Sequence, residues 1–112
     1  MAIDRLKTGI WVQAQVRLCG LQNIPIYVLR SGDADAGALF LKISSRDGLC
    51  RLYTQMRAVS GDIAWTSAGA EPRMTEGDAI AYLKRQTNID PDIWIIEMED
   101  PEGRYELDGP LI

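Results

Sequence analysis

The chain has 112 residues, with 12 Lys and Arg against 16 Asp and Glu, two cysteines and no histidine. A length of about 110 residues favours one domain built around a single core. The lack of histidine excludes Ser-His-Asp and Cys-His nucleophile systems, the HExxH zinc helix and the Cys2His2 finger. A net charge of −4 argues against a general binder of nucleic acid or anionic membranes, so we expect neither as a partner.

The N-terminal region does not have the pattern of a secretory signal. Arg5, Lys7, Gln13, Gln15 and Arg17 interrupt its apolar stretches. No apolar run elsewhere approaches the roughly 18 residues that a membrane-spanning helix needs. We therefore expect a cytoplasmic protein without a membrane span.

The two cysteines do not form a recognisable motif. Cys19 and Cys50 lie 31 residues apart, which is neither a CxxC redox spacing nor a metal-binding spacing. Two thiols also cannot complete a structural zinc site without histidine. Because each lies among apolar residues, we expect buried, reduced cysteines, with a Cys19–Cys50 disulfide as the alternative.

Residues 4–22 are predicted to form the first helix, which has two apolar faces. A broad arc, which we expect to be buried, comprises Ile3, Leu6, Ile10, Trp11, Ala14, Leu18 and Leu21. A narrower stripe on the far side comprises Val12, Val16 and Cys19. A helix with one buried face does not need this stripe, so either another part of the chain or a partner covers it. We predict an interface through Val12, Val16 and Cys19, or through an exposed strand edge, in a homodimer.

Four segments of β character follow, at residues 24–30, 38–43, 49–57 and 63–66. Pro25 confines the start of the first segment to an edge or an entry position. Asp47-Gly48 between two apolar runs is a hairpin signal. The four segments are therefore predicted to form an antiparallel meander.

A second helix and a last strand complete the predicted elements. Thr75 followed three residues later by Asp78 is typical of a helix N-cap, and it predicts a helix that continues to about Thr87. Pro91 ends it, and residues 93–98, which open Ile-Trp-Ile-Ile, are predicted to form a buried central strand. The order α-β-β-β-β-α-β predicts an α+β fold in which an antiparallel sheet of about five strands carries two helices. We expect residues 1–112 to form a single domain.

The loop Gly32–Gly37 contains an Asp-x-Asp pair. Asp33 and Asp35 on a glycine-hinged loop could share a hard cation such as Mg²⁺ or Ca²⁺. The register of an EF-hand fails, because the third acid is missing and Ser44 stands where the loop requires glutamate. In the alternative interpretation, the aspartates hydrogen-bond their own backbone in Asx-turns.

The negative charge is concentrated at the C-terminal end. Residues 90–112 hold eight acids and one base, whereas residues 1–89 hold eight acids and 11 bases. The acidic C-terminal segment 99–112 could be a solvated end, a flap that lies on the basic body, or a docking surface for a basic partner. These alternatives stay open at the level of sequence.

Three motifs in this order resemble a known family of short alphaproteobacterial proteins, the domain of unknown function 1491. The motifs are Lys7-Thr8 with Trp11-Val12 and Ala14, then Gly32-Asp33-x-Asp35-Ala36-Gly37-Ala38, then Asp90-Pro91-Asp92-x-Trp94-x-Ile96-Glu97. The resemblance implies a small, single-domain, cytoplasmic bacterial protein. It brings no assigned activity, cofactor or catalytic residue.

These observations favour a non-enzymatic interaction or structural protein whose partner is another protein or a second copy of itself. The alternative is a small metal-dependent enzyme or ligand binder that uses Mg²⁺ or Ca²⁺ at Asp33 and Asp35. The sequence names no substrate for either function.

Overall fold

The computed structural model describes residues 7–57, 59–60, 62–69 and 71–112, which form two helices and six strands. Their order is α1 (Thr8–Leu21), β1 (Ile26–Arg30), β2 (Leu39–Ser44), β3 (Leu49–Arg57), β4 (Ile63–Ser67), β5 (Met74–Thr75), α2 (Glu76–Ile89) and β6 (Trp94–Glu99). The predicted α+β class and order of elements are confirmed, and β5 is an additional short strand. None of the helices in these ranges is long and apolar enough to span a membrane.

The sheet is mixed rather than antiparallel throughout. Its order is β1-β6-β2-β3-β4, with β5 paired to β3. Of the four strands of the predicted antiparallel meander, β2, β3 and β4 form it. The prediction is wrong for β1, because β6 lies between β1 and β2 and runs parallel to β2. The parallel pair arises because α2 returns the chain to the end of the sheet at which β2 begins. The predicted central position of the last strand is confirmed, since Trp94, Ile95 and Ile96 are buried.

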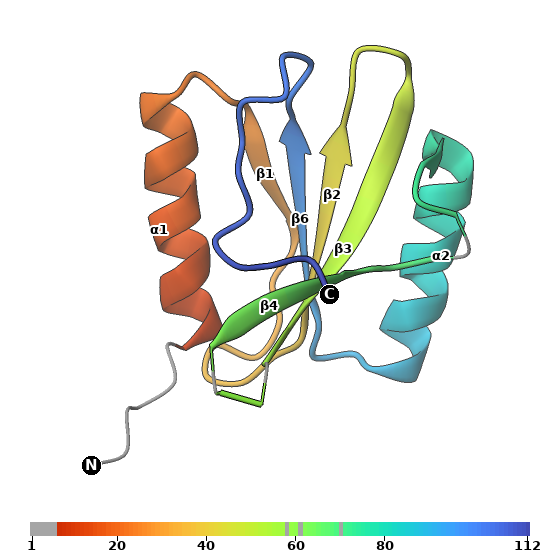
Figure 1. The fold of residues 1–112 in the computed structure, drawn as a ribbon. Coiled ribbons are helices and arrows are strands. Elements are labelled where there is room, and N and C mark those ends of the chain that lie inside the picture. The colour runs from red at the N-terminus through yellow and green to blue at the C-terminus, as the bar shows by residue number, and fades with distance from the viewer. Residues whose placement is uncertain (1–6, 58, 61, 70) are drawn as a thin grey trace.

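The sheet separates two hydrophobic clusters, because successive side chains of a strand point to opposite faces. Leu39 and Leu41 of β2 pack on the face that α1 covers, together with Trp11 and Trp65. Phe40 between them packs on the opposite face with residues of α2. Figure 1 shows the resulting arrangement, with α1 and α2 on opposite sides of the sheet and the C-terminal segment crossing on the α1 side.

The start of α1 and its buried face both differ from the prediction. The helix begins at Thr8 rather than at residue 4; Lys7 is extended, and Ile3 and Leu6 lie outside the described residues. Its buried residues are Thr8, Trp11, Val12, Gln15 and Cys19. The described part of the broad arc, residues 10–21, therefore faces outward except at Trp11, and the stripe that contains Val12 and Cys19 faces the sheet.

Polar partners explain this orientation of α1. The indole Nε1 of Trp11 donates to Asp108, and Gln15 accepts a 2.8 Å hydrogen bond from the hydroxyl of Tyr105. Buried donors and acceptors without partners are costly, so the face that can reach these groups turns inward even though it contains a glutamine.

Local signals at the hairpin and at α2 are confirmed. The turn between β2 and β3 contains Gly48 at φ +81°, a backbone conformation that glycine adopts without strain. The side chain of Thr75 accepts a 3.2 Å hydrogen bond from the backbone N–H of Asp78, as the N-cap pattern predicts. These two signals depend on neighbouring residues only, and so they can be seen in the sequence.

A buried lysine lies under the first turn of α2. Lys42 on β2 is 2% exposed, and its Nζ forms ion pairs with Glu76 at the start of α2 and with Glu97, its neighbour on β6, at 3.6 Å. A buried charge requires such partners. The pairs tie α2 to the centre of the sheet.

The acidic C-terminal segment is part of the folded body. Asp100, which is 5% exposed, accepts hydrogen bonds from the backbone N–H groups of Arg104 and Tyr105. Asp108 accepts hydrogen bonds from both Trp11 and Trp65. Of the three alternatives considered above, the flap that lies on the body fits this part of the segment, and several of its acids have structural roles.

Candidate binding sites

The Asp-x-Asp loop between β1 and β2 has a structural explanation. Oδ2 of Asp33 accepts a 2.9 Å hydrogen bond from the backbone N–H of Ala36, and the carbonyl oxygen of Asp33 accepts one from the N–H of Gly37. Asp33 therefore bonds its own local backbone, as the alternative interpretation expects, but to the N–H three residues on rather than two as in an Asx-turn. The carboxylate of Asp35 lies 3.6 Å from Nζ of Lys7, and both side chains are exposed.

The same loop offers two acidic side chains to a cation, those of Asp33 and Asp35. Within the part of the chain that the structure describes, no group of three or more His, Cys, Asp or Glu side chains could hold a metal ion. Ca²⁺ takes six or more oxygen ligands, and Mg²⁺ demands a near-octahedral set. The geometry therefore offers no support for a Mg²⁺ or Ca²⁺ site at Asp33 and Asp35.

The predicted interface stripe on α1 is wrong for two of its three residues. Val12 and Cys19 are 4% and 0% exposed, because they pack in the cluster between α1 and the sheet. Another part of the same chain therefore covers them, which is the alternative to a partner considered from the sequence. Val16 is 43% exposed and remains accessible.

The outer edge of β1 is the sheet edge that stays open. Tyr27, Val28 and Leu29 are 47%, 42% and 53% exposed, and no strand among the described ranges pairs with β1 on the side away from β6. The opposite edge is covered, because Trp65 of β4 exchanges backbone hydrogen bonds of 2.8 Å with Pro110 and Ile112. The molecule thus has one free edge and one covered edge.

The ladder between β1 and β6 shows which backbone groups of β1 are free. The N–H of Glu99 donates to the carbonyl of Pro25, and Tyr27 lies opposite Glu97 in the same register. Because hydrogen-bonded positions alternate along an antiparallel strand, Tyr27 directs its backbone groups toward β6. Ile26 and Val28 consequently direct their N–H and C=O groups toward the open edge.

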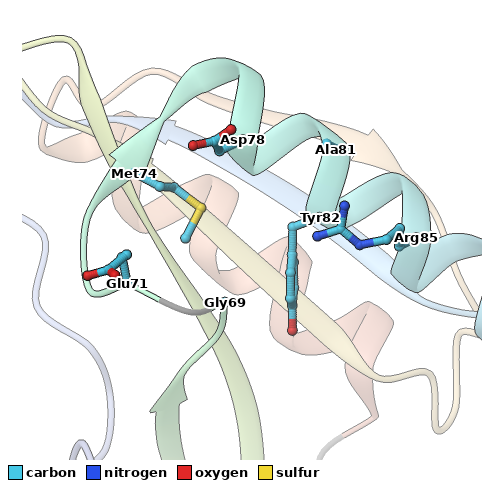
Figure 2. Close-up of a pocket in the computed structure, with 7 residues that line it drawn as sticks. All are labelled: Gly69, Glu71, Met74, Asp78, Ala81, Tyr82 and Arg85. Atoms are coloured by element: carbon cyan, nitrogen blue, oxygen red, sulfur yellow. The ribbon is translucent and has the colours of Figure 1, made fainter.

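A pocket of 220 Å³ lies between α2 and the loop that precedes β5 (Figure 2). Asp78, Ala81, Tyr82 and Arg85 of α2 line one side, and Gly69, Glu71 and Met74 line the other. No motif in the sequence predicts this pocket. The spacing of Asp78, Tyr82 and Arg85 places them on one face of the helix, but the contribution of the loop depends on the tertiary structure.

Comparison with known proteins identifies the family. The model described as "Protein of unknown function (DUF1491)" matches residues 6–108. The chain belongs to the DUF1491 family. This confirms the resemblance carried by the three motifs.

Solved structures of DUF1491 proteins have the same fold. A crystal structure of a family member from Caulobacter crescentus CB15 is 38% identical with a TM-score of 0.84, over 96% of this chain and 100% of that chain. An NMR structure of a family protein from the same organism, also 38% identical, has a TM-score of 0.81 over 96% of each chain. A solution structure of a protein from A. tumefaciens is 25% identical with a TM-score of 0.74, over 88% of this chain and 89% of that chain. No curated protein matches the chain, so no activity accompanies these similarities.

The three motifs that resemble DUF1491 meet at one junction of the fold. The hydroxyl of Thr8 donates a 2.9 Å hydrogen bond to the carbonyl of Gly37, which ties the first motif to the second. The N–H of Asp33 donates to the carbonyl of Asp92, and the indole of Trp94 donates to the carbonyl of Asp33, which ties the second motif to the third. The motifs therefore hold the start of α1 and the start of β6 on the Gly32–Gly37 loop.

The cysteines of this DUF1491 chain are not placed for chemistry. Cys19 packs on the α1 face of the sheet and Cys50 on the α2 face, and both are free thiols. The alternative of a Cys19–Cys50 disulfide is therefore wrong. Burial raises the pKa of both thiols above the ordinary value, which disfavours the reactive thiolate.

Proposed function

We propose that the chain is a cytoplasmic, non-enzymatic interaction protein that forms a homodimer through the open edge of β1. The observation that carries the proposal is the exposed apolar run Tyr27-Val28-Leu29 on an edge strand with free backbone groups at Ile26 and Val28. Two free, buried thiols fit the reducing conditions of a cytoplasm.

A second copy of the chain can pair its β1 antiparallel to this β1, which gives the free backbone N–H and C=O groups hydrogen-bond partners. With the two-fold axis at Tyr27, Ile26 of one protomer lies opposite Val28 of its partner, and each such pair exchanges both of its backbone hydrogen bonds. Tyr27 then faces its own counterpart across the axis in a close pair without backbone hydrogen bonds. Such an arrangement buries the apolar side chains of both copies and brings no like charges together.

The difference between the two sheet edges favours a dimer over an extended assembly. Pairing of β1 with β1 uses the same surface on both copies, which closes the assembly at two. The other edge cannot continue the sheet, because residues 110–112 cover Trp65 of β4. Pro25 and the irregularity between Val28 and Arg30 also keep the free edge short.

The dimer is expected to be concentration-dependent. β1 has five residues, and an edge of this length buries less than the roughly 1,200 Å² of a typical stable complex. We therefore expect monomers at about 10 µM and dimers at about 1 mM, as for a dissociation constant between these values. Sedimentation velocity across this range measures the transition.

A matched pair of variants tests the proposal. Tyr27→Lys places two positive charges opposite each other at the axis and should keep the protein monomeric at all concentrations. Leu18→Lys on α1 changes a side chain of similar exposure, 49% against 47%, and should leave the dimer intact. Val28→Pro, which removes an outward N–H and leaves the bonds to β6, should also give a monomer. A protein that is monomeric at 1 mM, or one that Leu18→Lys disrupts as much as Tyr27→Lys, would contradict the proposal.

A further inference from the structure

The pocket in Figure 2 lies on the flank of α2 next to the loop before β5, and it is independent of the β1 edge. Met74, which is 9% exposed, forms an apolar part of its wall together with Ala81. A volume of 220 Å³ is below the roughly 300 Å³ at which pockets for larger ligands begin. A pocket of this volume can hold one short alkyl chain of a small ligand.

Tyr82 presents one face of its ring to this pocket. Arg85 lies on one side of the ring, with its guanidinium carbon 5.9 Å from the centroid, and Met74 and the hollow lie on the other side. The edge-to-face contact with Phe40, with centroids 6.1 Å apart, holds the ring in place. An aromatic face attracts a cation placed within about 6 Å of it.

The pocket also has two carboxylates that form no ion pair within the described residues, those of Glu71 and Asp78. Two charged residues close to them in sequence do form ion pairs, since Arg73 pairs with Asp47 and Glu76 pairs with Lys42. Two unpaired acids against one arginine, which already stacks on Tyr82, leave the pocket attractive to positive charge.

Two larger hollows beside the C-terminal segment do not have this character. Their volumes are 350 and 390 Å³, but three of the polar residues that line them, Asp100, Asp108 and Tyr105, are already engaged. Asp100 accepts two backbone N–H groups, Asp108 accepts two indole N–H groups, and the hydroxyl of Tyr105 donates to Gln15.

We propose that the pocket of Figure 2 binds a small organic cation with an apolar stem, an alkylammonium or alkylguanidinium group. The stem lies against Met74 and the open face of Tyr82. The charged head lies beside the carboxylate of Asp78, which accepts its hydrogen bonds, and the charge of Glu71 on the facing loop adds to the attraction. Free amines and the basic side chains of peptides share this chemistry.

Titration of the full chain with butylguanidinium and pentylammonium, followed by backbone NMR shifts, tests the proposal. At ordinary ligand efficiency, a ligand of about eight non-hydrogen atoms binds with a dissociation constant on the order of 1 mM. The largest shifts should fall at Met74, Asp78 and Tyr82. Valerate, an anion with a similar stem, should not produce them. Stronger shifts with valerate, or no saturable shift with either cation, would overturn the proposal.

Three variants separate the pocket from general surface attraction. Asp78→Asn should weaken butylguanidinium binding by about 5- to 10-fold, since it removes a charge-assisted hydrogen bond. Glu71→Gln should weaken it less, since it removes a neighbouring charge. Glu106→Gln changes an exposed acid in another part of the molecule and should have no effect. If all three variants weaken binding of the cation equally, the cation is attracted only by the overall negative charge of the protein, and the proposed site is overturned.

A capped amino acid distinguishes the two sources of the cation. If Nα-acetyl-arginine amide binds more tightly than butylguanidinium, the ligand is a basic side chain of a peptide. The reverse order indicates a small free cation. Both results support the cation site. Failure of all three cations to bind overturns it.

Discussion

The indole Nε1 of Trp65 donates a 2.9 Å hydrogen bond to the carboxylate of Asp108, 43 residues further along the chain. The other carboxylate oxygen of Asp108 accepts a hydrogen bond from Trp11 at 2.6 Å. The two rings lie at an angle of 51° with their centroids 5.6 Å apart. One acidic residue of the C-terminal segment therefore fixes α1 and β4 relative to each other.

Asp108→Ala should destabilise the protein. The substitution leaves two indole N–H groups without an acceptor, at Trp11 and Trp65, which are 2% and 0% exposed. We expect the free energy of unfolding to fall by about 2 kcal/mol or more, since a buried unpaired donor costs about 1–3 kcal/mol. Urea denaturation measures the change. Glu106→Ala in the same segment, at an exposed site, is the control and should change stability by less than about 0.5 kcal/mol. Equal effects of the two substitutions would be inconsistent with this role of Asp108.

Gly32→Ala and Gly20→Ala should have opposite effects on stability. A Cβ at Gly32 would collide with the backbone carbonyl of Asp92, which cannot move without disturbing the junction of the three motifs. We expect a loss of more than about 2 kcal/mol, as for other overpacked sites. Gly20 lies in α1 with no atom within 4 Å of the added Cβ, so alanine there should stabilise the helix by about 0.5 kcal/mol. Thermal and urea unfolding of both variants provide the comparison, and a neutral Gly32→Ala would show that the loop is not held as described.

Ser45→Ala should raise the pKa of Asp47. The side-chain hydrogen bond from Ser45, the backbone N–H of Leu49 and Arg73 hold this pKa at about 2, below the ordinary 3.8. Because the folded-state pKa is lowered, ionised Asp47 stabilises the folded state above about pH 4, and this contribution is lost as the pH falls toward 2. NMR titration of the carboxyl carbon should show a larger upward shift in Ser45→Ala than in Arg73→Gln, since Ser45 makes the largest contribution. The opposite ranking would show that Arg73 dominates.

Most elements of the fold could be predicted because their signals are local. The strand at Leu49–Arg57 was predicted with the bounds that β3 has, and the cap at Thr75 was predicted with its partner Asp78. β5 was missed because a strand of two residues has no periodicity to detect. The parallel pairing of β2 with β6 was missed because strand order depends on where α2 returns the chain.

The candidate sites were less predictable than the fold. The sequence singled out the Gly32–Gly37 loop, but it did not show that Asp33 bonds to the backbone N–H of Ala36 and to the indole of Trp94 at the junction. The exposed strand edge was predicted as an alternative interface, although only the strand order shows that it is β1. The pocket beside Tyr82 combines α2 with a loop that has no motif, and nothing in the sequence marks it.

The sequence by itself determined which residues form helices and strands, since these depend on the spacing of apolar side chains and on capping and turn residues within a few positions. It also excluded histidine chemistry and indicated the family. Tertiary structure decided which face of α1 is buried. The helix has a broad and a narrower apolar face, and the choice between them depends on Asp108 and Tyr105. These residues lie 97 and 90 residues away from their partners Trp11 and Gln15. A buried polar group needs its partner wherever the chain places it, and that requirement cannot be seen in local periodicity.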